Sequence, residues 1–182
     1  MHEAEEKEFI RQLLDPASQQ AAFRRLVSEY SRPLYRHIRH LVIDHDDTDD
    51  ILQNTFVKVF RRLPTFKGES RLYTWMYRIA TNEAISFLKQ KSKRYKVNSE
   101  ELQTRLVENL KADAYFEGDE LQARLQKAVA TLPEKQQLVF RMKYYQELKY
   151  EEISEILGTS VGALKASYHH AVKKIEEYFN ED

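Results

Sequence analysis

YEEISEILGTSVGALKASYHHAVKKI, residues 150–175, is the stretch of the sequence that decides the fold. Apolar residues recur in it at intervals of three and four, over about 150–157 and again over about 161–178, which is the period of amphipathic helices. Gly158 follows the last apolar residue of the first segment, where a glycine typically ends a helix. A short helix, a glycine-bearing turn and a longer helix have the spacing of a helix-turn-helix, in which the first helix braces the second.

The second helix of this pair divides into two faces. One arc is apolar and is predicted to be buried: Val161, Leu164, Tyr168, Ala171, Val172, Ile175 and Tyr178. The opposite arc contains no acid and carries Lys165, Ala166, His169, His170, Lys173 and Lys174. Lysine and imidazole groups contact phosphates and base edges, so this outer arc is a candidate surface for duplex DNA. Any amphipathic helical pair shows a similar division, and a plain structural role is the alternative.

The same period runs through nearly the whole chain, without a convincing strand pattern. Helices are expected at about 3–13, 19–43, 48–63, 70–94, 119–131, 134–146, 150–157 and 161–178. Between Tyr95 and Gly118 the period weakens and acid accumulates, which is typical of a linker. The sequence therefore predicts an all-α fold with two small helical domains, residues 1–95 and 119–182, joined by an acidic linker at 96–118.

Composition excludes several classes of protein. The 182 residues are 42% hydrophobic, which is enough to bury a core, and the absence of cysteine excludes disulfides and thiol chemistry. The four glycines form no phosphate-binding loop, and no nucleophile, base and orienting group can be assembled. No long apolar run or signal peptide is present, so a cytoplasmic protein with no catalytic residues, cofactor or membrane insertion is expected.

The formal net charge of zero conceals a strong segregation of charge along the chain. Residues 58–96 hold eleven Lys or Arg against Glu69 and Glu83, whereas residues 97–124 hold seven acids against three bases. A chain sorted in this way can present a cationic surface to nucleic acid despite its neutral sum.

The segment TDDILQNTFVKVFRRL, residues 48–63, has one apolar arc that is predicted to be buried: Leu52, Thr55, Phe56, Val59, Phe60 and Leu63. The other arc carries Asp50, Gln53, Asn54, Val57 and Arg61. A solvated surface is one interpretation of this second arc. A face of amides with an exposed valine is also consistent with a docking surface for a partner helix.

The only tryptophan of the chain lies in FKGESRLYTWMYRIATN, residues 66–82. A helical wheel puts Tyr73 and Tyr77 on the buried arc, and it aligns Trp75 with Arg71, Arg78 and Asn82 on the other side. An aromatic ring among cations and an amide suits single-stranded nucleic acid, because bases stack on aromatic rings and phosphates form ion pairs with cationic side chains. The alternative is that Trp75 packs against a neighbouring helix while the cations are solvated.

Three motifs then occur in a characteristic order: DDILQNTFVKVF, FKGESRLYTWMYRIATNEAISFLK and LPEKQQLVFRMKYYQELKYEEISEILGTSVGALKASYHHAVKKI. They closely resemble conserved regions 2 and 4 of bacterial sigma-70 family sigma factors, specifically the compact extracytoplasmic-function (ECF) group, over about residues 20–95 and 119–179. The resemblance implies a transcription initiation factor that binds core RNA polymerase and directs it to promoter DNA.

The resemblance also implies roles for individual residues. Core-polymerase binding is expected of Asp50, Gln53, Asn54 and Lys58, with polymerase contacts at the β′ clamp coiled coil and the β flap. Capture of the −10 non-template strand is expected of Phe66, Lys67, Gly68, Glu69, Ser70, Arg71, Trp75, Arg78 and Asn82. Contact with the −35 duplex is expected of Lys143, Lys165, Ala166, His169, His170 and Lys173. A restraining anti-sigma factor is a further expected partner, and a small-molecule substrate is not expected.

The recognition helix departs from the family pattern at one point. Family members commonly have two arginines and a serine where this chain has Lys165, Ala166 and Ser167, and an aromatic residue and an arginine where it has His169 and His170. Bidentate guanine recognition by arginine is therefore missing, and a different −35 preference is expected.

Two rival functions are open to the sequence. A stand-alone helix-turn-helix regulator would bind duplex DNA without polymerase. A metal-dependent enzyme is suggested by DHDDTDD at 44–50 and by His37 and His40. Dense aspartates without the EF-hand glycine more often form a helix N-terminus, so no metal site is predicted.

Overall fold

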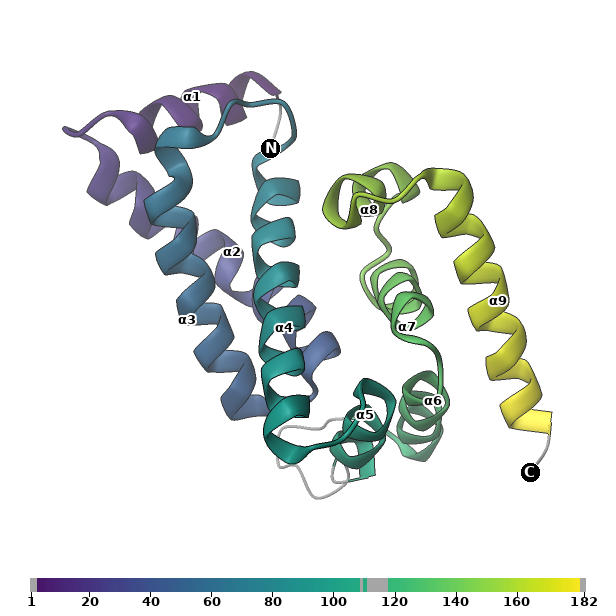
Figure 1. Ribbon diagram of the computed structural model, residues 1–182. Helices are drawn as coiled ribbons and strands as arrows, with labels where there is room; N and C mark the ends of the chain where they lie inside the picture. Colours follow the sequence, from purple (N-terminus) through teal and green to yellow (C-terminus); the bar gives the residue numbers. More distant parts are fainter. Residues whose placement is uncertain (1–2, 109, 111–117, 181–182) are drawn as a thin grey trace.

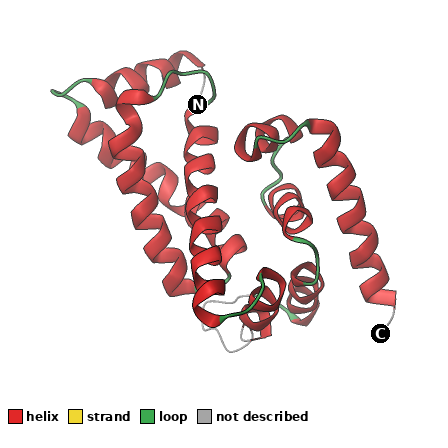
Figure 2. Ribbon diagram, viewed as in Figure 1, coloured by secondary structure: helices red, strands yellow, loops and turns green. Residues whose placement is uncertain are grey.

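The structure, a computed structural model, describes residues 3–108, 110 and 118–180. Helices joined by short loops make up these residues, and no strand occurs among them (Figure 2). The helices form two groups side by side, α1 to α4 and α6 to α9, with α5 at the base between them (Figure 1). The all-α fold class predicted from the sequence is confirmed.

The N-terminal group contains α1 (Glu3–Leu14), α2 (Gln19–Val42), α3 (His45–Arg62), η1 (Leu63–Thr65) and α4 (Leu72–Tyr95). Helices α2, α3 and α4 pack on one another around a core that includes Leu34, Ile38, Val59 and Met76. The Asp44 side chain accepts from the Asp47 main-chain N–H at 2.9 Å and caps α3. The aspartate run thus forms a helix N-terminus, as the sequence indicated.

The C-terminal group contains α6 (Glu120–Ala130), α7 (Glu134–Phe140), the π-helical turn η3 (Arg141–Tyr145), α8 (Tyr150–Leu157) and α9 (Val161–Asn180). Gly158 follows α8 with φ of 64°, a left-handed conformation that glycine adopts without strain. Helices α8 and α9 form the expected helix-turn-helix. The predicted inner arc of α9 is buried at Leu164, Ala171 and Ile175.

Three local expectations were wrong. A helix, α5 (Ser99–Glu108), occupies part of the expected linker and buries Leu102, Gln103 and Val107. The helix predicted over 134–146 changes to π-helical geometry at Arg141. Phe60, expected in the core, is 46% exposed, and the centre of its ring lies 5.0 Å from that of the partly buried Phe23.

The two groups contact each other directly. Helix α8 packs against α4, and the ring of Tyr77 on α4 contacts the apolar cores of both groups. Leu138 of α7 packs against the core of the N-terminal group. The N-terminal and C-terminal groups of helices are therefore packed against each other. Within the described residues, no helix is long and apolar enough to cross a membrane.

Candidate nucleic-acid interface

The loop between η1 and α4 borders an open hollow of about 410 Å³. Gly68 in this loop has φ of 71°, which a side chain would make unfavourable. The hollow is lined by Thr65, Phe66, Lys67, Glu69, Ser70, Thr74, Trp75, Arg78 and Glu155. Six of the expected −10 residues therefore line one concave surface, whereas Gly68, Arg71 and Asn82 do not line it. Glu155 of α8 was not expected there, and it brings an acid from the other group of helices.

Trp75 combines features of both interpretations of the helical wheel: it packs against the protein core, and it is also partly accessible. Its ring packs against the N-terminal core and stands 4.9 Å from the ring of Phe66, at an interplanar angle of 44°. The side chain is nevertheless only half-buried, and it lines the hollow together with the exposed Arg78. Asn82 is exposed one turn further along α4. Trp75 can thus present part of its ring to a base while its remainder is held by the protein.

Arg71 is positioned by Glu6, a residue that the sequence analysis did not identify. Glu6 of α1 is 7% exposed, and its carboxylate accepts from Arg71 Nε and from the Leu72 main-chain N–H, each at 2.5 Å. Arg71 is the N-cap of α4 and its own side chain makes no cap. Glu6 supplies the missing acceptor and a negative charge at the positive end of the helix dipole.

The polymerase-binding residues expected on α3 share one accessible surface. Asp50, Gln53 and Asn54 are exposed, and Lys58 donates to the carboxylate of Glu83 on α4. Val57 is 48% exposed and Phe60 is 46% exposed on the same helix. The face combines amides with two apolar side chains, a composition suited to a protein partner.

The outer face of α9 is accessible along its length. Lys165, Ala166, His169, His170 and Lys173 are all exposed, as expected. Lys143 comes from η3, and its Nζ lies 5.1 Å from the centre of the Tyr150 ring, while Lys165 Nζ lies 5.8 Å from the same centre. One tyrosine therefore positions two amines through cation–π contacts. Sequence reasoning missed Tyr150, although its place at the start of α8 puts it beside the recognition helix.

These surfaces define a two-domain helical protein with features for nucleic acid and for a protein partner. The family model of sigma-70 region 2 matches residues 26–94, and the family model of sigma-70 region 4 matches residues 122–175. The ECF RNA polymerase sigma-E factor of Haemophilus influenzae is 30% identical over 165 residues, covering 85% of this chain and 86% of that protein. The ECF sigma factor SigW of Bacillus subtilis is 30% identical over 158 residues, covering 82% and 84%.

The chain belongs to the ECF group of RNA polymerase sigma factors. Solved structures agree on the fold. CnrH, in complex with the cytosolic domain of CnrY, has a TM-score of 0.69 at 20% identity, covering 97% of this chain and 98% of that one. RpoE of Bartonella quintana, in complex with the anti-sigma factor NepR, has a TM-score of 0.65 at 20% identity, covering 88% and 98%.

Proposed function

We propose that this protein is the promoter-recognising subunit of RNA polymerase: it binds the core enzyme and directs it to specific promoters. Membership of the ECF sigma family over most of the chain is the observation that carries the function. The alternative, a stand-alone helix-turn-helix regulator with an N-terminal interaction domain, is not favoured, because residues 26–94 match region 2 of the sigma-70 family. No catalytic step is assigned to the chain, and its proposed place of action is the cytoplasm.

The proposed division of labour follows the surfaces. Residues 1–95 would bind polymerase through Asp50, Gln53, Asn54 and Lys58 of α3, and would capture the −10 strand at the hollow beside loop 66–71. Residues 119–182 would contact the −35 duplex through the outer face of α9. The exposed amide and apolar groups of α3, and the exposed bases of α9, support these assignments.

The function is tested by run-off transcription with core polymerase over a genomic promoter library. Added protein should give new transcripts from a limited set of promoters and return both promoter elements. Transcript levels equal to those of the core enzyme alone would contradict the proposal.

The role of Trp75 has its own test. Trp75→Ala should leave polymerase binding unchanged but impair open-complex formation, because it removes the surface on which a base stacks. The defect should be smallest on a pre-melted template. Trp75→Phe, which retains a ring against Phe66, is the matched control and should be the milder variant. Loss of helix content in Trp75→Ala would assign the residue to the core instead.

A partner that restrains the sigma factor is also proposed. The RpoE structure that shares this fold contains the anti-sigma factor NepR, which supports a corresponding partner here. Val57 and Phe60 are the exposed apolar groups that such a partner would cover. Co-purification of the protein from its native host, with Val57→Asp as the variant that should lose the partner, tests this proposal.

A further inference from the structure

Glu6 occupies a core position on an amphipathic helix. Helix α1 buries Glu6, Phe9 and Leu13, which recur at the spacing of a single helical face. Phe9 and Leu13 belong to the apolar core of the N-terminal group. The burial of a carboxylate is unfavourable unless its partners compensate for the loss of water. Packing alone therefore does not account for a glutamate at this position.

The partners of Glu6 lie where loop 66–71 joins α4. One carboxylate oxygen accepts from Arg71 Nε, and the other accepts from the Leu72 main-chain N–H. The Leu72 N–H is among the first N–H groups of α4, which have no acceptor within the helix. The Arg71 main-chain oxygen in turn accepts from the Trp75 N–H at 3.1 Å. Glu6 therefore fixes the first turn of α4, which contains Trp75.

The side chains that hold loop 66–71 lie at its two ends. At its start the ring of Phe66 contacts the ring of Trp75, and at its end Arg71 pairs with Glu6. In the part of the chain that the structure describes, the side chains in the middle of the loop make no hydrogen bond or ion pair: Lys67, Glu69 and Ser70. The conformation of the loop therefore depends on its ends, and its middle is available to a ligand.

The loop borders two open hollows. The hollow of about 410 Å³ described above is lined by Trp75 and Arg78 of α4. A second hollow, of about 550 Å³, is lined by Gly68 and Arg71 of the loop, which do not line the first. Helix α1 forms a wall of this second hollow through Glu3, Glu6, Lys7 and Ile10. The residues expected to bind the −10 strand are thus divided between two concave surfaces, and α1 borders one of them.

Arg71 connects Glu6 to the expected binding surface. Its Nε is held by Glu6, whereas 52% of its side chain is exposed. A guanidinium that is already held in place loses less conformational freedom when it binds a phosphate. The match to region 2 of the sigma-70 family begins at residue 26, so it does not extend to α1.

We propose that Glu6 is a positioning residue for capture of the −10 strand. Through Arg71 and the start of α4, its carboxylate holds loop 66–71 in the conformation that accepts the strand. The inference rests on the proposed function, because the strand is the proposed ligand of this loop. The effect of Glu6 on the conformation of the loop does not depend on that function.

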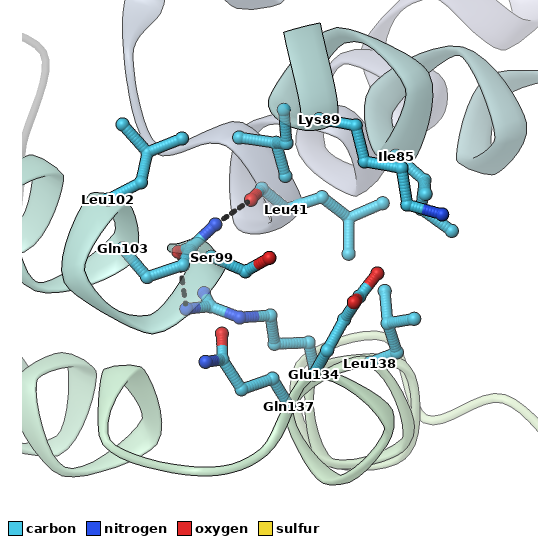
Figure 3. A pocket seen from close by; sticks show the side chains of 11 residues that line it. Leu41, Ile85, Lys89, Ser99, Leu102, Gln103, Glu134, Gln137 and Leu138 are labelled. Atoms are coloured by element: carbon cyan, nitrogen blue, oxygen red, sulfur yellow. Dashed lines mark hydrogen bonds between the residues drawn. The ribbon is translucent and has the colours of Figure 1, made fainter. Parts of the chain in front are cut away.

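Gln103 provides a comparison for a purely structural role. It is 6% exposed, and Glu6 is 7% exposed. Gln103 Nε2 donates to the Leu41 main-chain oxygen near the end of α2 at 3.1 Å (Figure 3), and its Oε1 accepts from Arg141 at 3.4 Å. Gln103 thus also joins a helix end to an arginine. It lines a small cavity of about 40 Å³ between α2, α4, α5 and α7, and it lines neither hollow at loop 66–71.

The first measurement is the accessibility of Trp75, the only tryptophan of the chain. Glu6→Gln retains an oxygen for the Leu72 N–H but loses the charge that pairs with Arg71, so it should increase the quenching of Trp75 fluorescence by acrylamide. Arg71→Ala, which keeps Glu6 as the acceptor at the start of α4, should increase the quenching to the same extent. Gln103→Leu is the matched control and should quench as the wild type does.

Circular dichroism checks that all these variants retain the helix content of the wild type. Quenching of Trp75 that is equal in the wild type, Glu6→Gln and Arg71→Ala would overturn the positioning role.

The second measurement is the affinity of the holoenzyme for the non-template −10 strand, supplied as a labelled single-stranded oligonucleotide. Its sequence is taken from a promoter that run-off transcription returns. Glu6→Gln should weaken this binding about tenfold, which is the typical effect of losing one hydrogen bond between charged groups. Its affinity for core polymerase should equal that of the wild type, because the expected polymerase contacts lie on α3. Gln103→Leu should bind the strand as the wild type does.

A double-variant cycle separates positioning from general stability. If Glu6 acts through Arg71, Glu6→Gln combined with Arg71→Ala should bind the strand as weakly as Arg71→Ala alone. Multiplied losses in the double variant, or an equal loss in Gln103→Leu, would overturn the proposal. A wild-type holoenzyme that transcribes from no promoter would refute the proposed function, and the quenching comparison would still decide whether Glu6 holds the loop.

Discussion

Glu6 is a buried carboxylate whose two partners lie at the start of α4. Glu6→Ala should lower the free energy of unfolding by about 1–3 kcal/mol, because it removes the acceptor of a buried main-chain N–H and of Arg71. Chemical denaturation measures the change. Glu3→Ala is the matched control on the same helix, since its pair with Lys7 is exposed and surface pairs contribute little. Equal stability of the two variants would contradict this role of Glu6.

His37 is fully buried and its hydrogen bonds suit a neutral ring. Thr81 donates its only hydroxyl proton to the Tyr77 carbonyl, so the His37 Nε2–H donates to Thr81 Oγ1 at 2.7 Å. His37 Nδ1 is then an acceptor. It lies 2.6 Å from Gln146 Oε1, and the Gln146 amide nitrogen is buried without a partner. A half-turn of this amide places its NH₂ against Nδ1, so that both ring nitrogens of His37 have a partner of the right kind.

Stability should therefore decrease in acid. Burial lowers the pKa of His37 from 6.5 to about 4, and burial together with Arg141 lowers the pKa of His40 to about 4. Both rings are neutral when folded, while the unfolded chain binds protons below about pH 6.5, so stability is complete above that pH and is lost as the pH falls toward 4. For His37 the loss amounts to about 3 kcal/mol. Urea denaturation between pH 7.5 and 4.5 measures it.

His37→Gln is the variant that assigns this dependence. It should be less stable than the wild type at pH 7.5 but lose less stability on acidification, because it has no imidazole to protonate. A slope as steep as that of the wild type would show that other groups cause the acid loss.

At the scale of the helix, the strength of the local signal decides what the sequence could predict. Helix α9 has a wide apolar arc and α8 ends at Gly158, and both were placed correctly. Helix α5 was missed because it is short and because one of its three buried side chains, Gln103, is polar; the helix packs against two different partners, α4 and α6. Its burial comes from tertiary contacts that the local pattern does not contain.

The same limit applies to the candidate site. Exposure on α3 and α9 follows from helical period, and the expected residues on those faces proved accessible. Glu6 and Arg141 were not found, because a sequence does not show which charged residues are buried, and Tyr150 was not found, because a sequence does not show which tyrosine lies beside two lysines. Arg141 meets the His40 carbonyl across 101 positions, and no local pattern reports a pair so far apart.

The outer face of α9 yields a prediction about salt. Lys165→Ala should weaken binding of the holoenzyme to promoter DNA and reduce the slope of log affinity against log salt by about one, because one phosphate contact is lost. Lys127→Ala, an exposed lysine on α6, is the matched control and should leave both quantities unchanged. Promoter binding measured over a range of salt concentrations decides between a DNA contact and a merely solvated lysine.

For the whole molecule, the important question is how strongly the two domains are coupled. Their apolar contact includes Leu138, which belongs to α7 but packs against the N-terminal core. Together with the shared ring of Tyr77, this contact should make the domains unfold as one unit in the wild type. Leu138→Gln removes apolar contact area between the domains, at a cost of about 1–2 kcal/mol, while most of each domain's own core is retained.

Differential scanning calorimetry should therefore show one transition for the wild type and two for Leu138→Gln. Leu121→Gln is the matched control. Leu121 is 64% exposed on α6, so this substitution makes the same chemical change outside the contact. Two transitions already present in the wild type would mean that the domain contact is too weak to couple unfolding. One transition in all three proteins would mean that the coupling does not depend on Leu138, and would leave the polar groups around Arg141 as its main source.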